Sequence, residues 1–148
     1  MAYTTTAEIE ADFKDLTFST TSNVKTADVT QFIVEADALI NSYVGARYIV
    51  PVTTSGEGLS LLKFLSRSLV SGRIKKIMEV KQEKSADANQ NVVGVYLSAT
   101  QVMKILSDIK DDVLSLAGAA LLVSNQGFNS YNVTNDIAPV IEKDLKQW

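Results

Sequence analysis

Residues 26–45, TADVTQFIVEADALINSYVG, carry the clearest helical pattern in the sequence and decide the fold class. Apolar side chains recur every three to four residues, a spacing that places them on one face of a helix: Val29, Phe32, Ile33, Ala36, Ile40, Tyr43 and Val44. Thr26 is suited to cap the start of this helix, and Gly45 is suited to end it. The stretch therefore predicts an amphipathic helix over 26–45 whose apolar face belongs to a core. The residues that follow, RYIVPV at 47–52, are β-branched and bounded by proline, so we expect an extended segment there.

Capping boxes predict two more helices, one on each side of this segment. Their residue pairs are Thr5 with Glu8 and Ser98 with Gln101. Apolar side chains at helical spacing follow each pair. We therefore expect a short helix over 5–15 and a longer one over 98–118.

A further helix is predicted over 58–80, where leucine and isoleucine keep a helical period and Gly72 allows a close approach or a slight bend. Residues 92–97 could form a short strand. Together these elements predict a small all-α fold of four helices. The residues expected to form its core are Phe32, Ile33, Ile40, Leu62, Leu65, Leu69, Ile105 and Ile109.

Composition restricts the chemistry that this chain can perform. The 148 residues are 46% hydrophobic, which suits one domain with a sizeable core. The absence of cysteine excludes disulfides and thiolate ligands, and the absence of histidine removes the commonest general base and metal ligand. Among clustered carboxylates, Asp108 and Asp112 are predicted to share a helical face, at i, i+4 spacing. We expect no enzymatic activity, no metal site and no cofactor.

The sequence also predicts that the protein stays in the cytoplasm where it is made. The most apolar stretch, residues 113–123, has about half the ~20 residues that a membrane-spanning helix needs. The first residues, MAYTTTAEIEADF, carry acidic side chains and no basic region, unlike a signal peptide.

Charge is distributed in blocks along the sequence. Residues 1–62 hold three basic and eight acidic side chains, residues 63–84 hold seven and two, and residues 85–148 hold four and seven. This layout suits head-to-tail self-association, or contact of the middle block with phosphates. The alternative is that the block is the solvated face of a helix. The residues of this candidate basic patch are Lys63, Arg67, Arg73, Lys75 and Lys76, with Lys81 and Lys84 beyond them.

The sequence changes character after Ser124. Helical periodicity stops, asparagine and glycine become frequent, and yet large apolar residues persist, unlike in disordered segments. We interpret residues 1–123 as a helical body and residues 124–148 as an arm that docks on another subunit or protein, with a short helix as an option over 138–146. The alternative is that the arm folds back onto its own bundle. The proposed anchors are Phe128, Tyr131, Ile137, Val140, Ile141 and Trp148.

The N-terminal half resembles the small head–tail connector (head-completion or adaptor) proteins of tailed bacteriophages. Those proteins begin with a Tyr-x-Thr helix, continue with a helix that ends in Tyr-(Leu/Val)-x-x-Arg-Tyr, and then reach an x-x-Pro-(Leu/Val) segment. The resemblance covers about residues 2–80 well and 102–118 loosely. The following residues match the second helix of those proteins and the x-x-Pro-(Leu/Val) segment after it, with Gly45 at the junction: Ala36, Ala38, Ile40, Asn41, Tyr43, Val44, Arg47, Tyr48, Pro51 and Val52.

This resemblance implies a structural role in the neck of the virion. Such proteins form a ring, commonly dodecameric, between the portal and the next component, which would be a stopper, a tail terminator or another neck protein. The ring extends the DNA channel, touches double-stranded DNA passively and needs no membrane. Arg47 and Tyr48 are expected to be structural, because arginine can satisfy carbonyls at a helix end and tyrosine can cover the core. The alternative function is that of an intracellular helical assembly module working as a small oligomer.

Overall fold

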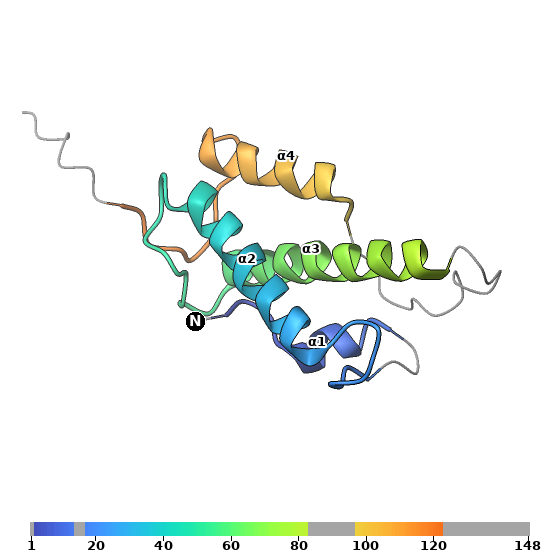
Figure 1. Cartoon of the computed structure of the whole chain (residues 1–148). Coiled ribbons are helices and arrows are strands. Elements are labelled where there is room, and N and C mark those ends of the chain that lie inside the picture. Colours follow the sequence, from blue (N-terminus) through green and yellow to red (C-terminus); the bar gives the residue numbers. More distant parts are fainter. Residues whose placement is uncertain (1, 14–16, 83–96, 123–148) are drawn as a thin grey trace, which may run out of the picture.

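The computed structural model describes residues 2–13, 17–82 and 97–122, which form four helices and no sheet. The helices are α1 (Thr6–Glu10), α2 (Thr26–Val44), α3 (Glu57–Gln82) and α4 (Ala99–Lys110). Figure 1 shows α3 as the long central helix, with α4 above it, α1 below it and α2 crossing it obliquely. The small all-α fold is confirmed. Residues 92–96 lie outside the described residues, and Leu97 is not in a strand.

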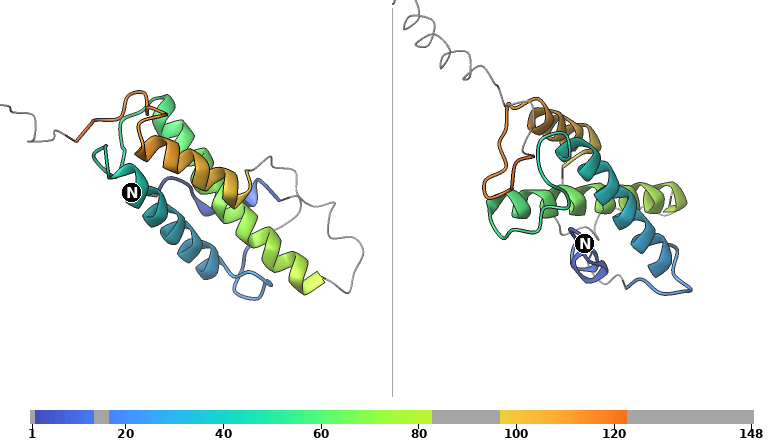
Figure 2. Two further views of the ribbon diagram at one scale, coloured as in Figure 1. Left: turned by 90° about the horizontal axis from the view of Figure 1, so that it is seen from above. Right: turned by 90° about the vertical axis from the view of Figure 1, so that its left-hand side faces the viewer.

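Two clusters of buried side chains hold the helices together, and both use α2 and α3. The first joins the C-terminal half of α2 and the N-terminal half of α3 to α4; the second joins their other portions to α1 and the loop after it. The two helices therefore run in opposite directions, and the two views of Figure 2 show that they cross obliquely. Burying each Leu or Ile side chain contributes about 1.5–3 kcal/mol. Of the predicted core residues, Ile33, Ile40, Leu62, Leu65 and Ile109 are buried, and Phe32, Leu69 and Ile105 are partly buried beside them.

The start of each short helix is capped as predicted. The Thr5 and Ser98 hydroxyls accept hydrogen bonds from the backbone N–H groups of Glu8 and Gln101, at 3.3 Å each. The cap of α2 is Lys25, one residue before the predicted cap at Thr26. Thr26 is its first residue, and the backbone N–H of Lys25 donates to the Asp28 carboxylate at 3.0 Å.

Helix α1 is shorter than the predicted range of 5–15. It ends at Glu10, after which the N–H groups of Asp12 and Phe13 donate to carbonyls three residues earlier. This tight turn places the Asp12 carboxylate against α3, where it accepts hydrogen bonds from Arg67 and Ser71. Long-range contacts therefore end the helix where local periodicity predicted that it would continue.

Helix α4 ends at Lys110, so its predicted extension to 118 is wrong. Asp112 has a φ of 66°, in the left-handed region that stops a helix. The chain then turns back across the bundle. Val113, inside the predicted helix, is 76% exposed, whereas Leu116 is 3% exposed and reaches the core from a loop.

Two glycines of α3, Gly72 and Gly58, have opposite surroundings. A Cβ at Gly72 would meet no atom within 4 Å, so the predicted close approach does not occur there. A Cβ at Gly58 would lie 2.7 Å from the carbonyl oxygen of Ala117. The close approach is therefore at the first turn of α3, where the Gly58 N–H donates to the same oxygen at 3.1 Å.

Candidate interaction surfaces

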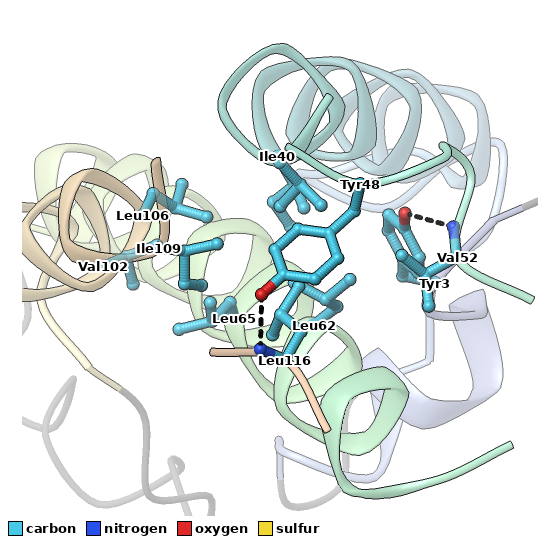
Figure 3. Close-up of a cluster of buried hydrophobic side chains, with 11 residues drawn as sticks. Tyr3, Ile40, Tyr48, Val52, Leu62, Leu65, Val102, Leu106, Ile109 and Leu116 are labelled. Carbon is cyan, nitrogen blue, oxygen red and sulfur yellow. Dashed lines mark hydrogen bonds between the residues drawn. The ribbon is translucent and has the colours of Figure 1, made fainter. Parts of the chain in front are cut away.

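The junction after α2 holds the end of the bundle together. Gly45 caps the helix with helical backbone angles, and its N–H donates to the Asn41 carbonyl at 2.8 Å. Tyr48 then turns into the core, 3% exposed, and its hydroxyl oxygen accepts a hydrogen bond of 3.0 Å from the Leu116 N–H (Figure 3). Arg47 forms an ion pair of 2.5 Å with Asp112. The two residues thus tie the segment after α4 to the end of α2, which is a structural role.

Tyr3 fastens the N-terminus to the same junction. Its hydroxyl donates to the Asn41 side chain at 2.7 Å and accepts from the Val52 N–H at 3.1 Å. Burial raises the pKa of Tyr3 above its ordinary value. Tyr43 packs partly buried against this core, while Pro51, which follows a cis peptide bond, is exposed. The residues that carry the resemblance therefore form one connected unit.

Beside this junction lies a group of exposed apolar side chains, here called the end patch. Residues 47–49 pair with 120–122 through hydrogen bonds from the Ile49 N–H to the Ala120 carbonyl (2.8 Å) and from the Leu122 N–H to the Arg47 carbonyl (2.7 Å). The Arg47–Asp112 ion pair holds residues 112–114 next to these two segments. The end patch consists of Ile49, Val113, Leu114, Leu121 and Leu122, which are 38–76% exposed. Exposed apolar groups on segments that lie side by side are candidate interaction sites.

Three of the five side chains of the candidate basic patch are paired with carboxylates. Arg67 turns to α1 and makes a two-pronged ion pair with Asp12, which raises the pKa of the guanidinium. Arg73 turns to α2, where it pairs with Glu35 and lies 4.0 Å above the ring of Phe32. Lys75 lies 3.7 Å from Glu79 on α3 itself. Lys63 and Lys76 are exposed.

The carboxylate pair considered for acid–base or metal chemistry is separated by the end of α4. Asp108 is on the helix, and Asp112 lies beyond its end and pairs with Arg47. Among the residues that the structure describes, no three acidic side chains gather where they could hold a metal ion. No helix in this part of the chain is long and apolar enough to cross a membrane.

Sequence reasoning missed two buried polar networks that cross the bundle. Burial raises the pKa of Asp37, although its carboxylate accepts hydrogen bonds from the Ser66 hydroxyl (2.7 Å) and the Tyr3 N–H (3.0 Å). Asp12 accepts from Ser71 at 2.8 Å and from Arg67. The available signal was that an aspartate and a serine occupy positions on the apolar faces of α2 and α3.

An apolar groove of about 660 Å³ lies between α2, α3 and the start of α4. Phe32, Ala36, Leu39, Leu69 and Leu97 line its walls, Gly72 leaves space in its floor, and Glu35, Arg73 and Lys76 complete the lining. No sequence pattern indicated this groove, because its shape depends on how the helices are placed relative to one another.

Comparison with protein families identifies the origin of the chain. The family described as "Bacteriophage Mu, Gp36" matches residues 3–127. The chain belongs to this family. It is therefore a phage protein, as the resemblance indicated. Searches of curated proteins and of solved structures found no match.

The Gp36-family match and the structure both stop short of the predicted arm anchors. The matched range ends one residue before Phe128, and the described residues end at Leu122. All six proposed anchors therefore lie outside the described residues and outside the family match. The division into a body over 1–123 and an arm over 124–148 stays a prediction.

Proposed function

We propose that this chain is a head–tail connector: a structural virion protein that forms a ring between the portal and the next neck or tail component. In this role it extends the DNA channel and provides the docking surface for a stopper, a tail terminator or another neck protein. It is made in the host cytoplasm and resides in the neck of the virion. The dodecameric copy number is what the resemblance implies. Membership of a phage family supports the general assignment.

The observation that carries this proposal is the link between the resemblance residues and the end patch. Tyr3, Arg47 and Tyr48 fix the segments that display the exposed apolar side chains. A fold that anchors apolar groups in a solvent-facing position has a surface suited to a partner rather than to a substrate. The end patch is accordingly the proposed contact with a neighbouring copy or with the portal.

The proposal includes the absence of catalysis. The buried carboxylates, Asp12 and Asp37, accept hydrogen bonds that hold helices together, and Asp112 is in an ion pair. These groups act as structural links, which supports a virion component without cofactor. The exposed Lys63 and Lys76 are the basic side chains best placed for passive contact with double-stranded DNA or with an acidic neighbour.

An assembly experiment with the portal encoded in the same genome tests this proposal. The full chain is mixed with the portal, and the mass of the complexes is measured by light scattering. We expect a complex with many copies per portal. Ile49→Asp should abolish it, because a charge in the end patch must lose its hydration on docking. Val34→Asp is the matched control, since Val34 is 62% exposed on α2, outside the end patch.

Two other outcomes of the assembly experiment would contradict the proposal in different ways. A stable dimer that ignores the portal would favour the alternative of a small assembly module. Equal binding by both variants, each with an unchanged helical circular dichroism spectrum, would remove the end patch from the interface.

A further inference from the structure

The groove between α2, α3 and the start of α4 has the chemistry of a helix-binding site. Its walls are apolar and come from three helices, so a second amphipathic helix could lie between them in the helix-in-groove mode of recognition. Its charged rim carries Arg73 and Lys76 against Glu35, which leaves one positive charge in excess. The occupant should therefore combine an apolar stripe with a net negative charge.

The end of the sequence has both properties. Ile137, Val140, Ile141, Leu145 and Trp148 recur at intervals of three or four residues, the spacing of one helical face. Asp136 stands where an N-cap would be, and Pro139 falls in the first turn, where proline is tolerated. The segment 136–148 holds three acidic and two basic side chains, so its net charge is opposite to that of the rim.

The path of the chain leaves a neighbouring copy within reach as the source of this helix, and the proposed ring selects that source. Figure 1 shows the segment before Leu122 leaving at the end of α4 opposite Ala99, and Ala99 lines the groove. The fourteen residues from 123 to 136 span up to about 46 Å when extended. A contact from the exit end of one copy to the groove of the next is head-to-tail, which is the kind of contact that closes rings.

We propose that the groove binds residues 136–148 of a neighbouring copy as an amphipathic helix that begins at Asp136. This inference rests on the proposed ring and assigns the place on each subunit where the arm docks. Trp148, Ile141 and Val140 then lie against the apolar walls, while the acidic residues of the segment face Arg73 and Lys76.

Cysteine cross-linking tests the contact directly, because the natural chain contains no cysteine. Full-length Gly72→Cys is mixed with full-length Ile141→Cys, assembled with the portal and oxidised. We expect a disulfide-linked pair on a non-reducing gel, at least fivefold more abundant than with Lys104→Cys, an exposed control position on α4. Equal yields at the two positions would overturn the proposal. A disulfide found only when both cysteines are in one chain would overturn the neighbouring copy as the source.

A second variant blocks the groove without removing any contact of the fold. Gly72→Leu places a side chain in space that holds no atom within 4 Å of the Cβ position. Trp148 is the single tryptophan of the chain and lies in the proposed helix, so its fluorescence reports docking. We expect blue-shifted emission in the assembled protein and a red shift in Gly72→Leu but not in Lys104→Leu. Identical emission from the two variants would contradict the proposal.

The outcomes separate this inference from the proposed function. A ring that forms without the disulfide between the cysteines introduced at positions 72 and 141 leaves the connector role standing. It removes the groove as the docking site. The disulfide in a closed dimer would support the groove and contradict the ring. If no copies associate and no disulfide forms, both fall.

Discussion

The hydroxyl of Tyr48 and the backbone N–H of Leu116, 68 positions apart in the sequence, are joined by a buried hydrogen bond of 3.0 Å. This bond fixes the segment that follows α4 to the junction that follows α2 (Figure 3). The end patch is displayed by these two segments. Its geometry therefore depends on a buried contact that is distant in sequence.

Replacing Tyr48 by Phe should destabilise the fold by about 1–3 kcal/mol, because the buried Leu116 N–H loses its acceptor. Urea unfolding of the full chain measures the change. Tyr43→Phe is the matched control: Tyr43 is partly buried, no hydrogen bond to its hydroxyl is found among the described residues, and a change below about 0.5 kcal/mol is expected. Equal effects of the two substitutions would show that the Tyr48 hydroxyl contributes nothing.

Ile40→Ala should destabilise the protein by about 2–5 kcal/mol, since it leaves a cavity where α2 meets α3 and α4. Ile49→Ala, at a residue 53% exposed, should change stability by less than about 0.5 kcal/mol. Thermal melts followed by circular dichroism compare them. If Ile40→Ala melts at the parent temperature, the core assignment of α2 is wrong.

The two glycines of α3 should respond to alanine in opposite directions. Gly72→Ala should raise stability by up to about 1 kcal/mol, because alanine is the better helix former and its Cβ meets nothing. Gly58→Ala should lower stability, because the new Cβ would fall 2.7 Å from the backbone oxygen of Ala117. Urea unfolding midpoints decide the signs, and a stabilising Gly58→Ala would refute the close approach.

Asp37 and Glu8 should make opposite contributions to the pH dependence of stability. Burial raises the pKa of Asp37 in the folded state, so its favourable contribution is present at low pH and is lost as the pH rises through that raised pKa. For Glu8, burial is outweighed by hydrogen bonds from the Thr5 N–H and the hydroxyls of Thr4 and Thr5, and its pKa is lowered. Its contribution is present above the unfolded pKa of about 4.3 and is lost as the pH falls through the lowered value.

Unfolding curves from pH 3 to 7 measure both contributions as differences from variants that do not titrate. The free energy of unfolding of the parent minus that of Asp37→Asn should fall as the pH rises. The free energy of unfolding of the parent minus that of Glu8→Gln should increase as the pH rises. Parallel slopes for the two differences would contradict the assigned environments.

The sequence predicted what depends on local periodicity and missed what depends on contacts between distant residues. The pattern from Val29 to Val44 identified α2 and most of its buried face, and the capping boxes located the starts of α1 and α4. The ends of these two helices were predicted too late, because Asp12 is held by Arg67 and Asp112 is held by Arg47. Such partners are 55 and 65 positions away, and no local pattern reveals them.

For the candidate interaction surfaces, too, sequence patterns indicated local features and missed contacts between distant residues. Arg47 and Tyr48, which were expected to be structural, both contact the segment after α4, and the partner of Arg47 is the Asp112 carboxylate rather than helix carbonyls. The charge block at 63–84 suggested one basic surface, but a helix distributes successive residues around its axis, and Arg67 and Arg73 turn to different neighbours. The groove could not be predicted, since its shape is set by the angles between helices.

The most direct test of the connector role is to locate and count this chain in purified virions of the phage that encodes it. Quantitative mass spectrometry gives its copy number relative to the portal, and cryo-electron microscopy of the neck gives its position. The account predicts a copy number that matches the portal ring and helical density for residues 2–122 directly below the portal. Absence from purified virions, or a position away from the head–tail interface, would contradict it.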